Sequence, residues 1–96
     1  MAAGDVANFG PTSTATGAYL DLQPGAGVEV VIHNIAYESS MELYYYDGTN
    51  QIKVDEDLTG GSRLGLFLHC TNAKRYRIKN TDAASKFLSA DGMTTK

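Results

Sequence analysis

The sequence predicts an all-β protein, a small antiparallel β-sandwich or jelly-roll-like knob of about seven strands with an extended N-terminal arm. Apolar and polar residues alternate with a period of two along most of the chain, which is typical of strands with one buried face. Turn signals rich in Gly, Pro, Asn and Asp recur about every 8 to 14 residues, as in sandwiches and barrels. No stretch shows the period of an amphipathic helix.

Length and charge limit the classes of protein to consider. A chain of 96 residues is one domain, and it buries only about 60–65% of the surface that it exposes when unfolded, so oligomerisation would help to stabilise it. The net charge of −3 argues against binding nucleic acid through its phosphates. No run reaches the roughly 18 apolar residues of a membrane span, and the N-terminus lacks a secretory signal, so we expect synthesis in a cytoplasm.

Residues 1–17 are small and polar, and they predict an arm rather than a strand of the knob. Val6 and Phe9 could anchor this arm, and Pro11 interrupts it. A floppy tail without a docking role is the alternative interpretation. The β-sandwich domain is then expected over residues 18–92, with a C-terminal tail over residues 93–96.

Three strands are expected before residue 47, over residues 18–23, 28–37 and 41–46. The first alternates, with Leu20 and Leu22 facing one way and Tyr19 and Asp21 the other. The second has apolar residues on both faces, which predicts that it is covered on both sides. Its two apolar sets are Val28, Val30 and Ile32 on one face, and Val31, Ile35 and Tyr37 on the other.

The segment "MELYYYDGTNQIKVDED", residues 41–57, predicts a hairpin with an Asp-Gly turn. Alternation places Met41, Leu43 and Tyr45 inward and Glu42, Tyr44 and Tyr46 outward. Ile52 and Val54 are expected to point inward from the returning strand. Large, amphipathic tyrosines suit interfaces, so Tyr44 and Tyr46 are candidate partner or subunit contacts.

Three further strands complete the predicted knob. In the first, "LGLFLHC", Leu64, Leu66, Leu68 and Cys70 are expected on one face, and Phe67 and His69 on the other. In the second, "RYRIKN", Tyr76 and Ile78 point inward, and Arg75, Arg77 and Lys79 point outward. The third is the short segment "SKFLSADG".

The carboxylates of residues 41–57 raise the possibility of a calcium site or a catalytic pair. Asp47 lies at the turn, however, roughly 13 Å along the hairpin from Asp55, so the acids cannot all reach one ion. Glu42 and Asp55 are expected to be neighbours across the hairpin, on a solvated face where Lys53 would offset their charges. We therefore expect no metal site and no cofactor here.

The chain offers little for nucleophilic catalysis. Cys70 is the one cysteine, so neither a disulfide within the chain nor a cysteine-based zinc site is possible. His69 is next to Cys70 in the sequence and therefore faces the opposite side of the same strand, and no predicted contact brings His33 close to Cys70. We expect a protein that is not an enzyme.

The order of the segments "QPGAGVEVVIHNI", "MELYYYDGTNQIKVDED", "GGSRLGLFLHCTN", "YRIKN" and "ADG" resembles small tailed-phage virion proteins of the capsid decoration (cement) type. The resemblance runs from about Ala18 to Gly92 and depends on the motifs "VIHN", "ELYYYDGTN" and "RIKNT". None of these motifs encodes chemistry. The closing segment "FLSADG" departs from the pattern, which more often has an aromatic residue before the Asp-Gly.

The resemblance implies a structural protein of the virion, made in the cytoplasm of a bacterial host. It would bind the major capsid protein on the outside of an assembled icosahedral shell, at local threefold or twofold points, as a homotrimer that bridges neighbouring capsomers. The arm residues Val6, Phe9 and Pro11 would lie on the shell, so a chain without residues 1–16 should fold but bind weakly. The alternative is a tail- or fibre-associated module that binds a receptor or carbohydrate.

Overall fold

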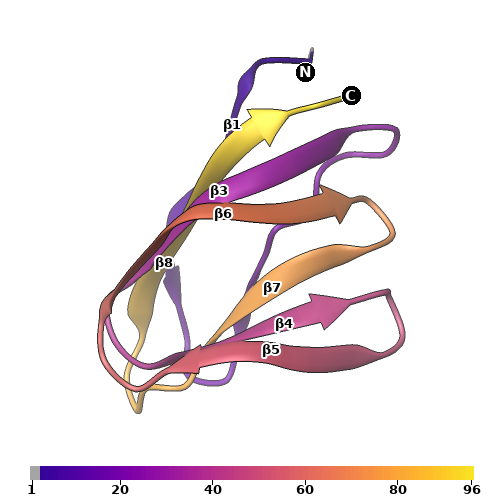
Figure 1. The fold of residues 1–96 in the computed structure, drawn as a ribbon. Coiled ribbons are helices and arrows are strands. Elements are labelled where there is room, and N and C mark those ends of the chain that lie inside the picture. The colour runs from indigo at the N-terminus through magenta and orange to yellow at the C-terminus, as the bar shows by residue number, and fades with distance from the viewer. Residues whose placement is uncertain (1–2) are drawn as a thin grey trace.

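The computed structural model describes residues 3–96, which form eight β-strands in two facing four-stranded antiparallel sheets (Figure 1). The all-β prediction is confirmed, with eight strands instead of seven. Sheet A has the order β1-β8-β3-β6, and sheet B has the order β2-β7-β4-β5. The strands are β1 (Val6–Thr14), β2 (Tyr19–Asp21), β3 (Glu29–Tyr37), β4 (Met41–Tyr46), β5 (Gln51–Asp57), β6 (Gly61–Thr71), β7 (Arg75–Asn80) and β8 (Lys86–Thr94). Within residues 3–96 no helix is long and apolar enough to cross a membrane.

The chain passes from one sheet to the other at each connection except the β4–β5 hairpin. This hairpin is the predicted Asp-Gly hairpin, and Tyr46 pairs with Gln51 across it. The two termini lie at the same end of the molecule (Figure 1), where the N–H of Gly4 donates to the backbone oxygen of Thr94 at 2.7 Å.

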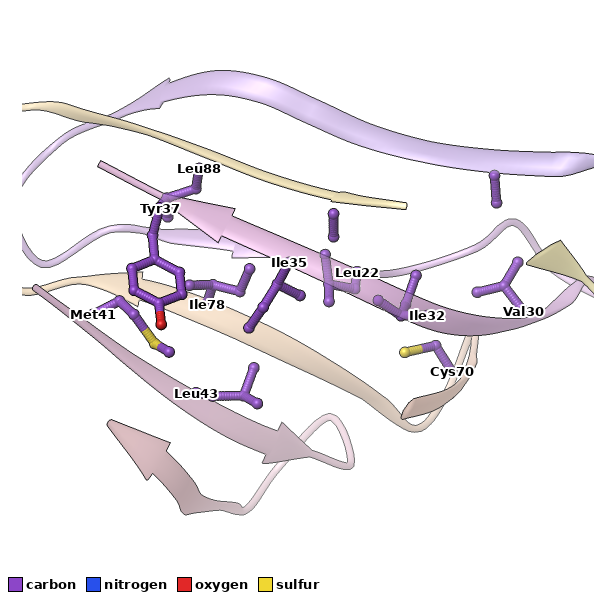
Figure 2. Packing of buried hydrophobic residues seen from close by; sticks show 12 residues of the cluster. Leu22, Val30, Ile32, Ile35, Tyr37, Met41, Leu43, Cys70, Ile78 and Leu88 are labelled. Atoms are coloured by element: carbon purple, nitrogen blue, oxygen red, sulfur yellow. The ribbon is translucent and has the colours of Figure 1, made fainter. Parts of the chain in front are cut away.

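The hydrophobic core lies between the sheets and is built from the inward-facing residues of both (Figure 2). From sheet B, β4 contributes Met41 and Leu43, and β7 contributes Ile78. These side chains are at most 4% exposed, and the inward positions predicted for them are confirmed. The other members of the cluster are Ala7, Leu22, Val30, Ile32, Ile35, Tyr37, Cys70, Leu88 and Ala90.

A bulge in β3 corrects the predicted faces of this strand. His33 is an extra residue between two pairs that β3 makes with β8. One extra residue reverses the alternation, so Ile35 and Tyr37 turn into the core instead of away from it, and they are 1% and 4% exposed. The two strands approach so closely here that a Cβ on Gly92 of β8 would collide with the backbone of β3.

Strand β6 has a wider irregularity opposite the same point, where residues 65–67 face a single residue of β3. Gly65 has a φ of 71°, in the left-handed region that favours glycine. The prediction that Leu64 shares the inner face with Leu66 and Leu68 is therefore wrong. Leu64 lies on the outer face of sheet A and is 71% exposed.

The predicted burial of Ile52 and Val54 is also wrong, because these side chains are 64% and 49% exposed. Ile52 does pair with the inward-facing Tyr45, but β5 is the edge strand of sheet B and has β4 as its one neighbour in the sheet. Val54 lies at a register shift in β5.

The expected arm corresponds largely to β1, an edge strand of sheet A that pairs with β8. Ala7 and Thr14 are 1% and 5% exposed, and Phe9 packs against the core. The prediction of a free arm over residues 1–17 is thus wrong for residues 6–14, and removal of residues 1–16 would delete a strand. Residues 1 and 2 lie outside the described part of the chain. The expected tail, residues 93–96, continues β8 to Thr94.

Candidate interaction surfaces

The outer face of sheet B gathers the tyrosines that the sequence places outward. Tyr44 and Tyr46 are half-buried there, and β7 lies beside β4 on one side while β5 lies on the other. Register places Tyr44 beside Arg77 and Tyr46 beside Arg75, and β2 lies beyond β7. We call five side chains of this surface the tyrosine–arginine face: Tyr19, Tyr44, Tyr46, Arg75 and Arg77.

Guanidinium groups stack on the tyrosine rings of this face. The Cζ atom of Arg77 lies 3.9 Å from the ring centroid of Tyr19 and 4.3 Å from that of Tyr46. The Cζ atom of Arg75 lies 4.8 Å from the Tyr46 centroid. All three distances are within the roughly 6 Å of a cation–π contact. Tyr19 also meets Tyr44 edge-on, with 5.9 Å between ring centroids, so the five side chains form one continuous layer.

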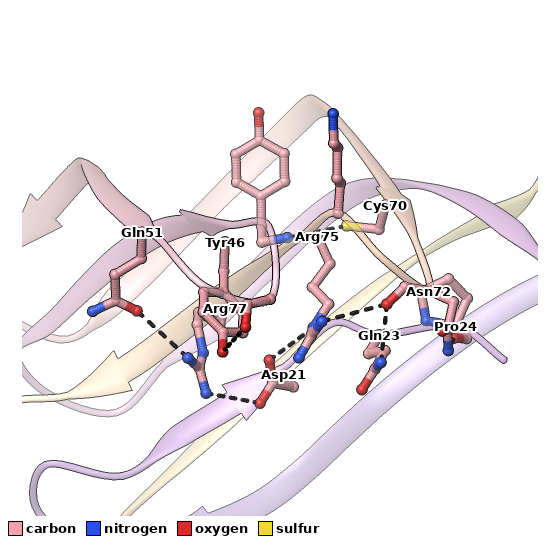
Figure 3. Close-up of polar contacts among 12 residues, drawn as sticks. Asp21, Gln23, Pro24, Tyr46, Gln51, Cys70, Asn72, Arg75 and Arg77 are labelled. Carbon is pink, nitrogen blue, oxygen red and sulfur yellow. Dashed lines mark hydrogen bonds and ion pairs between the residues drawn. The ribbon is translucent and has the colours of Figure 1, made fainter. Parts of the chain in front are cut away.

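Asp21 of β2 binds both guanidinium groups (Figure 3). Arg75 Nε donates to Asp21 Oδ1, and Arg77 Nη2 donates to Asp21 Oδ2, each at 3.1 Å. Gln51 of β5 accepts from Arg77 Nη1 at 3.4 Å and donates to the Tyr19 hydroxyl at 3.1 Å. The side chains of Arg75 and Arg77 are only 12% and 17% exposed, so their positions are set by these neighbours.

Glu42 extends the polar pattern along β4. The Tyr44 hydroxyl donates to Glu42 Oε1 at 2.6 Å, which lowers the pKa of Glu42 and raises the pKa of Tyr44 to about 12. Across the hairpin Glu42 pairs with Glu56 rather than with Asp55, because β5 shifts register at Val54. Lys53 Nζ lies 3.6 Å from Glu42 and 3.5 Å from Glu56, so it offsets the like charges.

The other carboxylates of the hairpin are separated as the sequence predicts. Asp47 accepts two backbone hydrogen bonds within the turn, at 2.9 and 2.7 Å, which lower its pKa. Asp55 and Asp57 lie at the far end of β5, where they bind Arg63 at 3.1 and 3.8 Å. Among residues 3–96, no three His, Cys, Asp or Glu side chains are grouped so that they could hold a metal ion.

Asp57 also connects the two sheets. Tyr37 of sheet A donates its hydroxyl to Asp57 Oδ2 of sheet B at 2.7 Å. Burial, with this hydrogen bond, raises the pKa of Tyr37 to about 12, and the same bond lowers the pKa of Asp57. Together with Arg63 these residues form a polar clamp between β3, β5 and β6.

The structure separates the candidate contact residues of the N-terminal segment. Val6 is 66% exposed on the outer face of sheet A, where it pairs with Met93. Phe9 is half-buried against the core, and Pro11 is exposed after a cis peptide bond with Gly10. These residues therefore do not form one surface with Tyr44 and Tyr46, which belong to the other sheet.

Cys70 and the two histidines lie on strands of sheet A, His33 as the bulge residue of β3 and Cys70 and His69 in regular pairs of β6. Cys70 is 1% exposed, and burial raises the pKa of its thiol to about 11. His33 Nδ1 lies 2.9 Å from the backbone oxygen of Leu66, and its ring meets Phe67 edge-on. His69 is exposed on the outer face, opposite Val31 of β3.

All four edge strands carry features that discourage another chain from adding a strand. β1 has Pro11 and a register shift, and β2 is only three residues long. β5 has Lys53 and a register shift, and β6 has its irregularity together with the inner-face Arg63. We therefore expect contacts with partners to use the faces of the sheets rather than their edges.

Sequence reasoning placed Tyr44, Tyr46, Arg75 and Arg77 outward but did not connect the tyrosines with the arginines. The signal for each strand was present in its alternation. The strand order β2-β7-β4-β5 could not be read from local alternation. This order brings Tyr19 to Gln51 and Asp21 to Arg75, pairs that are about 30 and 55 positions apart in the chain.

No pocket is present on the surface of residues 3–96. No protein-family model matches the chain, and no curated protein is significantly similar to it.

Proposed function

We propose that this protein is a phage capsid decoration (cement) protein of β-sandwich type. It binds the major capsid protein on the outside of the assembled icosahedral shell and bridges neighbouring capsomers, as a structural component of the virion rather than an enzyme. The resemblance in "VIHN", "ELYYYDGTN" and "RIKNT" supports this proposal, as does the pair of antiparallel sheets. The resemblance implies three copies in the oligomer.

The observation that carries the proposal is the tyrosine–arginine face. Tyrosine and arginine are enriched among the residues that dominate binding energy at protein interfaces. Here Arg75 and Arg77 are already fixed by Asp21 and by the tyrosine rings, so binding costs little side-chain entropy. A rigid amphipathic surface on a sheet face suits contact with a broad protein surface.

The same stacking makes carbohydrate binding the less favoured alternative. A sugar ring packs against the open face of an aromatic side chain. Both Arg75 and Arg77 lie over the ring of Tyr46, and Tyr44 contacts Tyr19 and bonds to Glu42. A protein surface that offers carboxylates or carbonyl groups to the rim of this face is the better match.

Binding would stabilise the shell by mass action. A ligand that binds the assembled shell and not its dissociated subunits favours assembly in proportion to its concentration over its Kd. Many copies that together join neighbouring capsomers turn weak single contacts into a strong combined effect.

The test is reconstitution of purified protein with shells of the encoding phage that lack it. We expect Tyr46→Ala to weaken shell binding about 30-fold or more, the loss of one dominant contact residue of about 2 kcal/mol. Leu58→Ala, a change at a loop residue that is 80% exposed, is the matched control and should bind as the unmodified chain does.

Copy number separates the proposal from its alternative. A decoration protein saturates the shell at hundreds of copies, whereas a tail or fibre component is present in a dozen or so. Saturation at a few copies per particle, or undiminished binding of the Tyr46 variant, would contradict the proposal.

A further inference from the structure

The outer face of sheet A carries exposed apolar side chains on three of its strands, β1, β8 and β6, beside polar residues such as Asn34 and Asp91. Register aligns Val6 of β1, Met93 of β8 and Val31 of β3 in one row that ends at His69 of β6. Phe67, which lies between the inward-facing Leu66 and Leu68, joins the row from the same edge strand as Leu64. We call this surface the apolar face, and its members are Val6, Val31, Leu64, Phe67 and Met93.

Four of these five side chains are open to solvent. Phe67 is 75%, Leu64 71%, Val6 66% and Met93 45% exposed, while Val31, flanked in the row by Met93 and His69, is 7% exposed. Isolated apolar residues are normal on a protein surface, but a contiguous group of this kind marks a contact site.

The apolar face holds few charged groups. Asp91 lies two residues from Met93 on the same side of β8, and its partner is the uncharged Asn34, whose Nδ2 donates to it at 2.8 Å. Glu29, at one end of β3, lies 3.6 Å from Lys96. The outer face of sheet B differs, because its strands carry Arg75, Arg77 and several carboxylates. A surface that covers the apolar face must itself be apolar and uncharged.

Another copy of the chain supplies such a surface. Two copies of the apolar face can meet through their apolar side chains, with Asp91 held by Asn34 in each copy, whereas the outer face of sheet B would bring its ion pairs against apolar groups. Two sheets that stack face to face at about 10 Å spacing are an ordinary packing arrangement of β proteins.

The outer face of sheet A approaches the size of one side of a standard interface. Its four strands are 9, 9, 9 and 11 residues long. At about 4.8 Å between strands and 3.3 Å per residue, the face measures roughly 19 by 30 Å, or ~570 Å² before the relief of the side chains is counted. A standard interface buries about 800 Å² on each partner, so the whole outer face of sheet A is needed, with the apolar face as the centre of the contact and the polar residues of the sheet as its rim.

We propose that the apolar face of sheet A is covered by the same face of a second copy of this chain, related to the first by a twofold axis. The contact is isologous, which means that both copies use the same surface patch. The inference does not rest on the proposed function, since it uses residues of the other sheet. It differs from the trimer that the resemblance implies.

The experiment measures the mass of the full chain in solution by analytical ultracentrifugation over a range of micromolar concentrations. We expect a reversible species of twice the 10.3 kDa chain mass. Phe67→Glu and Met93→Glu each place like charges in the apolar contact and should raise the dissociation constant by at least about ten-fold. Phe67 is 75% and Met93 45% exposed in the single chain, so the variants should keep the same Tm when dilute.

Leu58→Glu is the matched control, because Leu58 is 80% exposed but lies in the β5–β6 loop. It should pair like the unmodified chain. A monomer at every concentration, a trimer, or a dimer that both Glu variants leave unchanged would overturn the proposal.

Discussion

Asn80 is a fully buried polar side chain at the end of β7, and it links the two sheets. Its Nδ2 donates to the backbone oxygens of Thr14 at 2.8 Å and Ala84 at 2.9 Å, and its Oδ1 accepts from the N–H of Asp82 at 2.9 Å. Thr14 ends β1 of sheet A, so the first bond crosses between sheets. We predict that Asn80→Ala lowers the free energy of unfolding by about 3 kcal/mol, about 1 kcal/mol for each bond lost.

This loss corresponds to a fall in Tm of about 12–24 °C, since 1 kcal/mol is worth about 4–8 °C in a domain of this size. Thermal and urea unfolding, followed by circular dichroism, measure it. Asn50→Ala is the control, because Asn50 is exposed in the β4–β5 turn and the hydrogen bond to Asp47 comes from its backbone N–H. A fall of less than about 4 °C for the Asn80 variant would refute the reasoning that this side chain joins the sheets.

Three further predictions concern acid stability, thiol reactivity and a glycine. The pKa of Asp57 is lowered in the fold, chiefly by the Tyr37 hydroxyl, so its stabilising effect is present above about pH 4 and is lost as the pH falls through the lowered pKa. Asp57→Asn should therefore flatten the fall of Tm with acid, and parallel curves for the two proteins would contradict this. Cys70, buried and with a raised pKa of about 11, should react with a thiol reagent only after unfolding, whereas rapid labelling of the folded chain would show that it is accessible. Gly92→Ala should destabilise the protein by about 1–3 kcal/mol, because the added Cβ would collide with the backbone of β3. Gly61→Ala is the control, and it should change the stability by no more than about 0.5 kcal/mol, because a Cβ there meets open space. Equal Tm values for the two variants would argue against the close approach of β8 and β3.

The sequence predicts strands well where the alternation is uninterrupted. Residues 19–21, 41–46 and 75–80 have the inward and outward faces expected of them, and the Asp-Gly turn lies where it was predicted. In these segments large apolar residues alternate with charged residues or tyrosines. The hydrophobic period alone then determines which face is buried.

Prediction fails where a bulge shifts the period. His33 in β3 reverses the faces of the residues that follow it, so Ile35 points inward. Residues 65–67 in β6 place Leu64, which precedes them, on the opposite face from Leu68. No residue type in "VIHNIAY" indicates a β-bulge. The signal in "LGLFL" was the glycine, which in a strand often marks a bulge.

The prediction of a free N-terminal arm failed for a different reason. Its inward positions are small, with Ala7 and Thr14 buried beside the larger Phe9, and such a stretch reads as polar and flexible. It becomes a strand because β8 offers a partner, and that pairing joins residues more than 70 positions apart. Such long-range pairing is set by the whole fold and cannot be inferred from local composition.

The core accounts for the contrast between the two outer faces. Both inner faces are filled by the core cluster, so the fold makes no demand for apolar side chains outside it. On sheet B the outward positions carry stacked cations and ion pairs, whereas on sheet A Phe67, Leu64 and Met93 remain exposed, although a polar residue with high strand propensity, such as threonine, would suit these positions. Exposed apolar groups gain stabilising free energy only when a second surface covers them.

If the apolar face joins two copies, two tyrosine–arginine faces point away from each other on opposite sides of the pair, and each can bind its own capsomer. The two proposals then make a joint prediction: Phe67→Glu should keep the contact of a single chain with the shell but lose the bridging that stabilises it, which shell binding and shell melting, measured on the same sample, can tell apart.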